Sequence, residues 1–363
     1  MSFERIKKNF GFGCMRLKMN GEVVDYEEFS RMIDTFMEAG FNYFDTAHGY
    51  IGGLSEKAIR DCLVPRYPRE SYVLANKLSP WYYEVEEDIL PLFESQLTLT
   101  GVDYFDFYLF HCITDGNIDA YLNPKYGVYN YLMEQKKKGR IRHLGFSTHS
   151  SLDTIRRFLD AYGEGMEFGQ IQLNWLDYDF QNAKAKIDLL KEYNSPVWVM
   201  EPVRGGSLVK LAPAHEEQLK ALRPNATMAE WAFRFLQTIP DVAVTLSGMS
   251  NMAQLKENIA IYEEAHPLNV TEWNTILTIA DQMIAQQKVP CTACRYCTTH
   301  CPMELDIPHL IDLYNGHITE GTPVAISQDK QLPTACVGCR SCEAVCPQNI
   351  QISEVMSRMG ALL

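Results

Sequence analysis

Alternating strand-like and helix-like segments are the feature that most restricts how this chain can fold. Between residues 10 and 264, short apolar or aromatic runs alternate with segments whose apolar residues recur at helical spacing. The expected strands lie at about residues 10–17, 41–45, 71–76, 104–110, 141–146, 169–175, 197–200 and 242–246. The helices expected to follow them lie at about residues 25–40, 55–64, 84–99, 129–138, 152–162, 183–193, 228–236 and 253–264. Eight such units predict an α/β fold, a (β/α)8 TIM barrel.

The competing architecture is an open, doubly wound parallel sheet, which commonly carries a glycine-rich turn after its first strand. Here Gly11 and Gly13 are separated by one residue, but no third glycine follows at the spacing that a dinucleotide-binding fingerprint requires. The barrel is therefore the favoured interpretation.

Four titratable side chains lie at, or just beyond, the ends of three consecutive expected strands. Asp45 ends one strand and Tyr50 follows it in a short loop, while Lys77 and His111 come directly after the next two strands. Because the carboxyl ends of neighbouring parallel strands converge at one rim of a barrel, we expect the four groups to form one catalytic site.

These residue types suit the reduction of a carbonyl by hydride. Tyr50 can donate a proton to the developing oxyanion if its pKa is lowered from about 10, and the Lys77 ammonium is expected to lower it. Asp45 would hold Lys77 in place, and His111 would orient the carbonyl. Each residue taken alone is better explained as a loop, strand-end or core side chain, so the prediction rests on their combination.

A repeated cysteine pattern occupies the last quarter of the chain. Cys291-x2-Cys294-x2-Cys297-x3-Cys301-Pro302 returns as Cys336-x2-Cys339-x2-Cys342-x3-Cys346-Pro347. In two-cluster ferredoxins, three cysteines at this spacing bind one 4Fe–4S cluster, and the fourth, followed by proline, binds the other cluster. The segment resembles dicluster ferredoxin domains. The predicted ligand sets are Cys291, Cys294, Cys297 and Cys346 for one cluster, and Cys336, Cys339, Cys342 and Cys301 for the other.

Structural zinc is the alternative for these cysteines, although zinc ribbons normally use two separated Cys-x2-Cys pairs. A secreted disulfide framework would spread its cysteines along the chain, whereas eight of the eleven fall in these two clusters. The composition changes abruptly after residues 288–290. We therefore predict a barrel domain over residues 1–285 and a small, mainly helical ferredoxin-like domain over residues 286–363. Further helices are expected at about residues 265–287, 307–314 and 353–359.

Composition narrows the classes of function. The formal net charge of the 363 residues is −13, which disfavours binding to nucleic acid or to an anionic membrane. No basic-then-apolar segment opens the sequence, and no apolar run approaches the length of a membrane span. We expect a cytoplasmic protein with no membrane insertion and no nucleic-acid partner.

Three short motifs resemble a known family. Asp45-Thr46-Ala47-x-x-Tyr50, Asn76-Lys77 and Phe110-His111 are similar to the catalytic tetrad motifs of the aldo-keto reductases, and the resemblance covers about residues 8–264. It implies that the four titratable residues are catalytic and that NADH or NADPH lies across the barrel mouth. The cofactor-binding residues that it implies are Ser147, Thr148, Gln172, Met200, Glu201, Val203, Gly205, Ser247, Gly248, Met249, Gln254, Glu257 and Asn258.

Several positions depart from the common pattern of that family. Gly248, Met249 and Gln254 stand where many members place basic residues on the 2′-phosphate, so NADH and NADPH both stay open. Met200 occupies the position at which an aromatic side chain commonly stacks on the nicotinamide, and Thr148 replaces a frequent asparagine. The ferredoxin-like domain takes the place of the usual C-terminal substrate loop.

Three functions follow from this combination. The leading one is an oxidoreductase that reduces a small-molecule carbonyl, or oxidises the alcohol, and is accompanied by two 4Fe–4S clusters. The second is an electron-transfer protein that moves electrons between the barrel, the clusters and a redox partner protein. The third is a binding protein with a degenerate barrel, which the intact set of four catalytic residue types disfavours.

Two further expectations concern electrons and substrate. Hydride carries two electrons and each cluster carries one, so a flavin is the usual intermediary, although no motif here indicates one. Loops after strands 7 and 8 bind phosphates in many barrels, and Gly205 and Ser247 lie in those loops. Aromatic and thiol side chains near the strand ends either line a pocket for a sugar or ring substrate or serve as packing, namely Trp81, Tyr82, Cys112 and Trp175.

Overall fold

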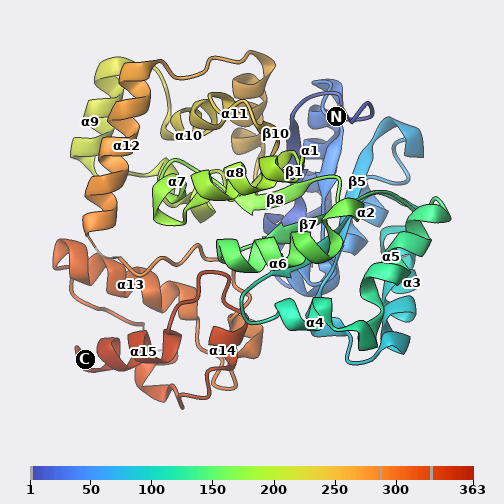
Figure 1. The fold of residues 1–363 in the computed structure, drawn as a ribbon. Helices are drawn as coiled ribbons and strands as arrows, with labels where there is room; N and C mark the ends of the chain where they lie inside the picture. Colours follow the sequence, from blue (N-terminus) through green and yellow to red (C-terminus); the bar gives the residue numbers. More distant parts are fainter. Residues whose placement is uncertain (1–2, 287, 328–329) are drawn as a thin grey trace. The chain divides into compact units, whose positions relative to one another are not determined.

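The structure is a computed structural model that describes residues 3–286, 288–327 and 330–363. Two compact units are present (Figure 1). The first comprises Met1–Val203 and Asn225–Val270, and the second comprises Arg204–Pro224 and Thr271–Leu363. This division draws two barrel-region segments into the second unit. The predicted domain boundary at residue 285 stays a prediction.

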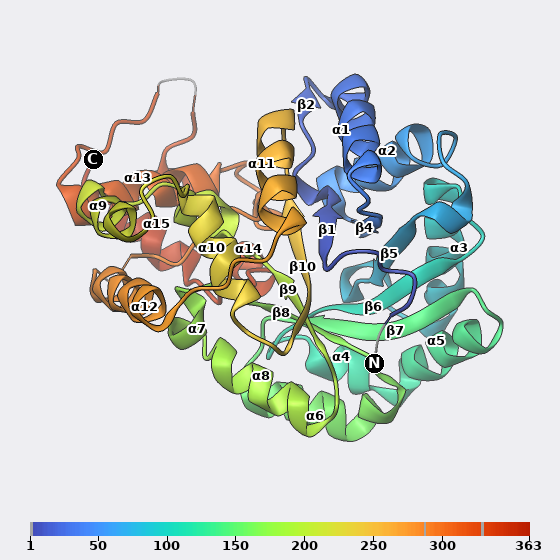
Figure 2. The ribbon, with the colours of Figure 1, turned by 90° about the horizontal axis from the view of Figure 1, so that it is seen from above.

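Eight parallel strands close into a barrel within the first unit, which confirms the predicted fold class. They pair in chain order, and the first strand closes the barrel by pairing with both the second and the last strand of the barrel. Figure 2 shows them inside a ring of helices. The strands are β1 (Phe10–Gly13), β4 (Tyr43–Asp45), β5 (Val73–Leu78), β6 (Phe105–Ile113), β7 (Ile141–Thr148), β8 (Gly169–Gln172), β9 (Val197–Met200) and β10 (Val242–Gly248).

A helix follows each barrel strand, as the periodicity predicted. Asp25 caps the first helix, because its side chain accepts a hydrogen bond from the Glu28 backbone N–H at 3.0 Å. Gly40, with a φ of +83°, lies just beyond the end of that helix. These helices are α1 (Tyr26–Glu38), α2 (Leu54–Cys62), α3 (Ile89–Thr100), α5 (Val128–Lys137), α6 (Leu152–Tyr162), α8 (Ala183–Glu192), α10 (Met228–Gln237) and α11 (Met252–Glu263).

Several predicted elements are shorter than expected. The strand expected over residues 10–17 ends at Gly13, where a 3₁₀ turn (Cys14–Arg16) begins, and polar side chains limit two others. The helix expected from residue 84 begins at Ile89, after a 3₁₀ turn (Glu86–Asp88) in which the Asp88 carboxylate accepts the backbone N–H groups of Glu84 and Val85. The strand expected to reach residue 175 stops at Gln172, where the Asn174 side chain accepts two backbone N–H groups and starts α7 (Asp177–Phe180).

The periodicity also missed some short elements. A two-stranded antiparallel hairpin is formed by β2 (Met19–Asn20) and β3 (Val23–Val24). The helices α4 (Ile118–Leu122) and α9 (Pro213–Leu222) lie in stretches for which the sequence predicted no element. α9 begins at a proline, a residue that suits the first position of a helix.

Aromatic rings fill the interior of the barrel. Tyr43, Phe107, Phe168 and Trp198 are fully or almost fully buried in one cluster. The ring of Phe3, from the segment before β1, lies edge-on at 4.8 Å from Trp198 and 5.3 Å from Phe107. These partners lie near the starts of their strands, so the N-terminal segment closes the amino end of the barrel.

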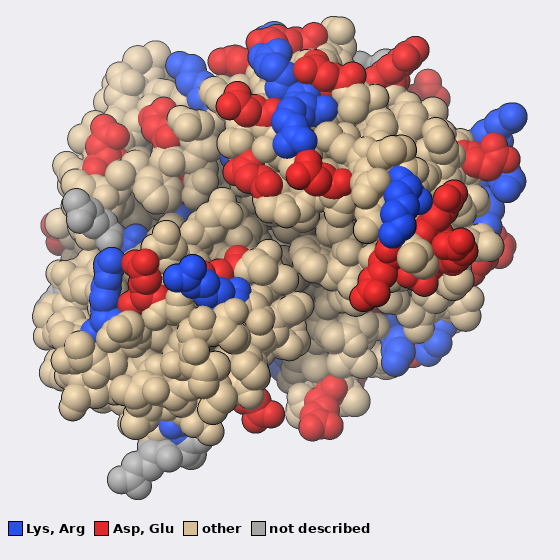
Figure 3. All heavy atoms as spheres, turned by 60° about the horizontal axis from the view of Figure 1, so that its bottom comes forward, with Lys and Arg blue, Asp and Glu red and all other residues tan. Residues whose placement is uncertain are grey.

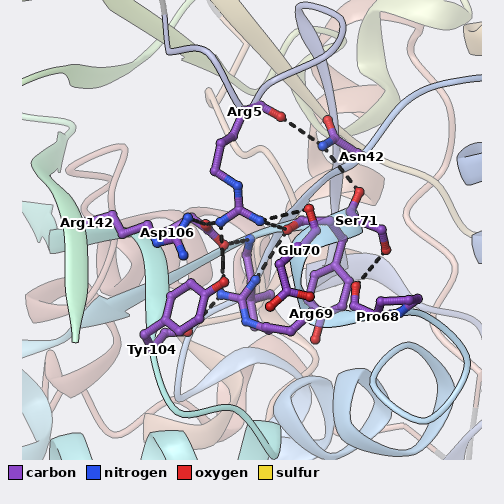
Figure 4. A network of polar contacts seen from close by, with 11 residues as sticks. Arg5, Asn42, Pro68, Arg69, Glu70, Ser71, Tyr104, Asp106 and Arg142 are labelled. Carbon is purple, nitrogen blue, oxygen red and sulfur yellow. Dashed lines mark hydrogen bonds and ion pairs between the residues drawn. The ribbon is translucent and has the colours of Figure 1, made fainter. Parts of the chain in front are cut away.

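A buried carboxylate organises the same end of the barrel (Figure 4). Asp106, the second residue of β6, forms ion pairs with Arg5, with Arg69 at 2.7 Å and with Arg142 at 3.6 Å. The Arg69 guanidinium also stacks 3.8 Å from the centre of the Tyr104 ring. This network lies at the amino ends of the strands. Residues at this end of a barrel usually contribute to stability rather than to catalysis.

The second unit is helical in its regular parts. Its helices are α9, most of α12 (Val270–Ala285), α13 (Ile307–Glu320), α14 (Ser341–Ala344) and α15 (Ile352–Gly360). The helices predicted near residues 307 and 353 are present, and the predicted end at residue 287 lies outside the described residues. Arg223 and Glu272 join α9 to α12 through two hydrogen bonds of 2.6 and 2.7 Å.

Two surface properties complete the description. Among residues 3–286, 288–327 and 330–363, no helix is both long enough and apolar enough to cross a membrane. Figure 3 shows one face of the molecule, on which acidic and basic side chains are interspersed rather than separated by sign.

Candidate active site and cysteine clusters

The structure brings the four predicted catalytic residues together at the carboxyl ends of three adjacent strands. Asp45 is the last residue of β4, Lys77 lies near the end of β5, and His111 lies near the end of β6. Tyr50 opens the turn that follows β4. All four side chains belong to buried residues. The neighbouring order of β4, β5 and β6 in the barrel is what places them on one rim.

Lys77 is the centre of this group. Its Nζ donates hydrogen bonds to Asp45 Oδ1 at 2.5 Å, to the backbone oxygen of Thr46 at 2.8 Å and to Tyr50 Oη at 3.2 Å. An ammonium group has three N–H donors, so each donor has an acceptor. Lys77 therefore fixes the position of the Tyr50 hydroxyl relative to the Asp45 carboxylate.

Burial changes the expected acidity of Tyr50. The sequence predicted that Lys77 would lower the pKa of Tyr50, but that prediction is wrong for the net shift. Burial raises the pKa of Tyr50 to about 12, and the opposing effect of the Lys77 ammonium is smaller. The Tyr50 phenol is consequently protonated at neutral pH, and it can act as a proton donor.

The charges of the other two groups follow from the same balance. Burial alone would lower the pKa of Lys77, but Asp45 and Tyr50 more than offset it, and the pKa is raised. Burial raises the pKa of Asp45, against the opposing effect of Lys77. Asp45 Oδ2 has no hydrogen-bond partner among the described residues, although it is buried.

His111 lies at a local irregularity of β6. The pairing of β6 with β7 shifts register between Phe110 and Ile113, and Cys112 adopts a φ of +55°. This is a bulge, which redirects side chains at the end of a strand. Burial lowers the pKa of His111 well below its ordinary value, with smaller contributions in the same direction from Lys77 and His149. The imidazole is therefore neutral at physiological pH.

A buried polar chain behind the site was missed by the sequence analysis. Glu56, on α2, is fully buried; its Oε1 accepts a hydrogen bond from Asn76 Nδ2 at 2.8 Å, and its Oε2 lies 2.9 Å from His48 Nδ1. This chain holds Asn76, the neighbour of Lys77. A signal was available, because Glu56 stands three residues before the apolar Ile59 and so shares the inward face of its helix.

The three residues implied for carboxamide binding lie at the ends of β7 and β8. Ser147 Oγ accepts the Cys112 backbone N–H at 2.8 Å. The Thr148 hydroxyl donates to the backbone oxygen of Ile113 at 3.1 Å, and Gln172 Nε2 donates to Asp177 Oδ2 at 2.7 Å. The side chains are thus held in place by the protein itself. Their role in cofactor binding stays a prediction.

The remaining implied cofactor residues lie at the ends of β9 and β10, in the loops that follow these strands and on α11. Met200 ends β9, and Glu201, with a φ of +59°, precedes Val203 and Gly205 in the loop that follows. Ser247 and Gly248 end β10, Met249 is fully buried, and Asn258 Nδ2 donates to Ser247 Oγ at 3.3 Å. Gln254, in the first turn of α11, accepts the Ser250 backbone N–H at 2.8 Å through Oε1, so its side chain points towards the loop before that helix; Glu257 is half-buried on α11.

The structure brings the eight clustered cysteines together in two sets of four. One hollow of the second unit is lined by Cys291, Cys294, Cys297 and Cys346, and a separate hollow is lined by Cys301, Cys336, Cys339 and Cys342. In the described part of the chain, no three His, Cys, Asp or Glu side chains are arranged to hold a metal ion. The lining of each hollow by four cysteines is the arrangement that a cubic cluster requires.

An apolar shell surrounds these hollows. Ile307 and Ile352 line both, and they belong to a buried cluster that also contains Leu310, Ile311 and Met356. Cys339 differs from the other seven cysteines because its residue is exposed. The residues present therefore fit one 4Fe–4S cluster in each hollow.

The closed parallel barrel and the cysteine-rich unit define a barrel enzyme that carries an iron–sulfur module. A family model described as the aldo/keto reductase family matches residues 9–281, and one described as a 4Fe-4S dicluster domain matches residues 290–350. The chain therefore belongs to the aldo/keto reductase family, is an oxidoreductase and carries a C-terminal 4Fe-4S dicluster domain. The resemblance suggested by the sequence motifs is confirmed.

Individual relatives agree with this assignment. The uncharacterized oxidoreductase YqkF of Bacillus subtilis is 26% identical over 281 residues, which cover 69% of this chain and 85% of the relative. L-galactose dehydrogenase of Arabidopsis thaliana is 25% identical over 283 residues, covering 72% and 86%. Among solved structures, the holo form of the aldo-keto reductase AKR11C1 from Bacillus halodurans is 26% identical, with a TM-score of 0.61, and covers 75% of this chain and 91% of that chain.

Proposed function

We propose that this oxidoreductase interconverts a small-molecule carbonyl and its alcohol, with Tyr50 as the general acid–base. The observation that carries the proposal is the hydrogen-bonding of buried Lys77 to both Asp45 and Tyr50. This arrangement holds a phenol at a strand end beside a fixed positive charge, which stabilises the phenolate formed after proton donation. The 25% identity to an L-galactose dehydrogenase supports chemistry at a carbon–oxygen bond.

The four residues have distinct parts in the proposed reduction. Tyr50 gives its proton to the carbonyl oxygen as charge develops there, and Lys77 stabilises the resulting phenolate. Neutral His111 donates a hydrogen bond that orients the carbonyl. Asp45 keeps Lys77 in position through the 2.5 Å hydrogen bond. Because the phenol is protonated at neutral pH, the site has the protonation state that carbonyl reduction requires.

The cofactor proposed for this site is NADH or NADPH. The unpartnered, buried Asp45 Oδ2 and the row of hydroxyl and amide side chains on Ser147, Thr148 and Gln172 fit a polar ligand at the strand ends. These three residues would hold the carboxamide. When bound, the nicotinamide supplies the hydride. Uncharged Gly248 and Gln254 near the expected adenosine site support the use of NADH, and fluorescence titrations with each nucleotide compare the two.

A panel of aldehydes, ketones and sugars tests the reaction. We expect consumption of reduced nicotinamide with at least one carbonyl class. Tyr50→Phe should lower kcat by about 10²- to 10⁴-fold, the usual contribution of a general acid, and leave nucleotide affinity unchanged. An unaltered kcat in Tyr50→Phe would overturn the proposed role. Ser195→Ala, which removes a buried hydroxyl near the start of β9, is the matched control.

We further propose that the second unit binds two 4Fe–4S clusters with exchanged fourth ligands. The support is that each hollow gathers three cysteines of one motif and the final cysteine of the other. Anaerobically purified protein should contain about eight iron and eight sulfide ions per chain. A content of about one zinc ion per cysteine set, without sulfide, would instead support structural zinc.

Electron transfer is the second candidate function. The exposed position of Cys339 brings one proposed cluster to the surface, where a redox partner protein could exchange electrons with it. A flavin in the barrel would couple hydride to single-electron steps. Bleaching of the cluster absorbance on mixing with NADH or NADPH would favour this function. Tight nucleotide binding without bleaching would favour the carbonyl reductase alone.

A further inference from the structure

The imidazole of His111 is in contact with a buried serine that the proposed reaction does not use. Ser79 Oγ lies 2.5 Å from His111 Nδ1, and both residues are buried, with exposed fractions of 1% and 5%. Ser79 directly follows β5 and lies two residues beyond Lys77. It contacts His111, which lies near the end of the neighbouring strand β6.

The backbone around His111 is held on both sides. The Tyr121 hydroxyl, from α4, donates to the His111 backbone oxygen at 2.5 Å and also lies 3.0 Å from the backbone oxygen of Leu78. On the other side, the Cys112 N–H donates to Ser147 Oγ at 2.8 Å. With the bulge fixed in this way, the contact with Ser79 determines which ring nitrogen of His111 faces away from β5.

Ser79 does not have the ordinary role of a serine at its position. It precedes a short 3₁₀ turn (Pro80–Tyr82) at the N-cap, where serine side chains usually accept a backbone N–H. Here the side chain makes no capping hydrogen bond. Within the residues that the structure describes, His111 Nδ1 is the hydrogen-bond partner of the Ser79 hydroxyl.

This pairing favours one direction of the hydrogen bond. If His111 Nδ1–H donated to Ser79, the serine hydroxyl would be left as a buried donor without an acceptor, which is unfavourable. If Ser79 donates to Nδ1, the serine is satisfied, and the proton of the neutral imidazole resides on Nε2. Neutral imidazole carries one N–H, so the second arrangement makes Nε2 the donor.

We propose that Ser79 is a positioning residue that holds neutral His111 in the Nε2–H tautomer. The Nε2–H group then donates a hydrogen bond to the carbonyl oxygen of the substrate. The inference rests on the proposed role of His111 in the reaction. Without Ser79 the imidazole exchanges between tautomers, and the Nδ1–H form presents an acceptor to the carbonyl, which repels it.

The first test reads the tautomer directly in the full-length holoprotein. Long-range ¹H–¹⁵N correlation spectra of ¹⁵N-histidine-labelled protein distinguish the two tautomers of a neutral imidazole, and His111→Gln assigns the signals. We expect the Nε2–H form in the unaltered protein and a mixture of forms in Ser79→Ala. Ser79→Thr, which retains a hydroxyl, should restore the Nε2–H form.

The second test reads turnover once a carbonyl substrate is known. Ser79→Ala should lower kcat by about 10- to 100-fold, the loss typical when a hydrogen bond that orients a functional histidine is removed. Nucleotide affinity should stay unchanged, and Ser79→Thr should recover most of kcat. Ser195→Ala, with its buried hydroxyl remote from the strand ends, should retain both the tautomer and the turnover of the unaltered protein.

The two tests separate failure of this proposal from failure of the proposed reaction. An Nδ1–H tautomer in the unaltered protein, or an unchanged tautomer in Ser79→Ala, would overturn the role of Ser79 whether or not any carbonyl is reduced. Absence of carbonyl reduction combined with the expected tautomer change would overturn the reaction and leave the role of Ser79 as the support of His111 intact.

Discussion

The Lys77–Asp45 ion pair sets the electrostatics of the strand ends. Both side chains are buried, so each charge would be costly alone, and their 2.5 Å hydrogen bond compensates for the loss of water. The same burial raises the pKa of Tyr50 and lowers the pKa of His111. The Lys77 cation therefore lies beside a protonated Tyr50, a neutral His111 and the Asp45 carboxylate. Such a site suits a reaction that creates negative charge on oxygen.

Replacing Lys77 with Met should impair both catalysis and stability. We expect kcat/KM to fall by about 10²- to 10⁴-fold, because Tyr50 loses the charge that stabilises its phenolate. The free energy of unfolding should fall by about 3 kcal/mol, because Asp45 is left buried without its partner. Urea denaturation and steady-state kinetics measure the two effects. The double variant Asp45→Asn with Lys77→Met should recover stability but not activity, and equal stability of both variants would contradict this account.

The pH dependence of the two reaction directions should differ. Reduction requires the protonated phenol, whose pKa is raised to about 12, so kcat for reduction should stay level from neutral pH into the alkaline range. Alcohol oxidation requires the phenolate, which becomes more abundant as the pH rises towards that pKa. Oxidation rates should therefore increase with pH. If kcat for reduction declined between pH 7 and 9 while nucleotide affinity stayed constant, the pKa of Tyr50 during turnover would be much lower than about 12.

At the scale of strands and helices, the alternation of short apolar runs with helically spaced apolar residues was sufficient. All eight barrel strands and their following helices could be predicted, because apolar residues mark the buried faces. The cluster of Asp45, Lys77 and His111 followed from the parallel order of three strands. The bulge at Cys112 could not be predicted, since it depends on Ser147 and Tyr121 from other elements. The direction of the Tyr50 pKa shift was missed for a similar reason, because burial is a property of the folded chain.

β6 carries a buried ion-pair network at one end and a proposed catalytic residue at the other. Asp106 near its start pairs with three arginines, and His111 lies near its end. Asp106→Asn should therefore lower the free energy of unfolding by about 2–3 kcal/mol and leave kcat/KM unchanged. Asp103→Asn, which alters an exposed carboxylate just before β6, should change neither quantity. A large loss of activity without loss of stability would show that the two ends are coupled.

At the scale of the whole molecule, the cysteine sets tie distant parts of the sequence together. Each hollow takes three cysteines from one motif and one from the other, so the two motifs fold as one body. The same apolar side chains, Ile307 and Ile352, line both hollows. The proposed clusters therefore share a core, and the loss of one would loosen the support of the other.

Removal of single cysteines should reveal the exchanged ligands. Cys346→Ala should weaken the cluster bound by the first motif, and Cys301→Ala should weaken the cluster bound by the second. We expect each variant to retain about four of about eight iron ions, measured on anaerobically purified protein. Cys62→Ala, which alters a buried cysteine of the barrel, should retain all the iron. Full iron content in Cys346→Ala and Cys301→Ala would contradict the assignment.

The interrupted make-up of the second unit has a consequence for biosynthesis. α9 belongs to that unit. In the sequence it is separated from the remainder of the unit, Thr271–Leu363, by Asn225–Val270, a segment of the first unit. Glu272 and Gln282, which hydrogen-bond to Arg223 and His215, leave the ribosome later than β10, the strand that closes the barrel against β1. The nascent chain can thus complete its barrel while α9 still lacks these two hydrogen bonds, which form only after α12 has been synthesised.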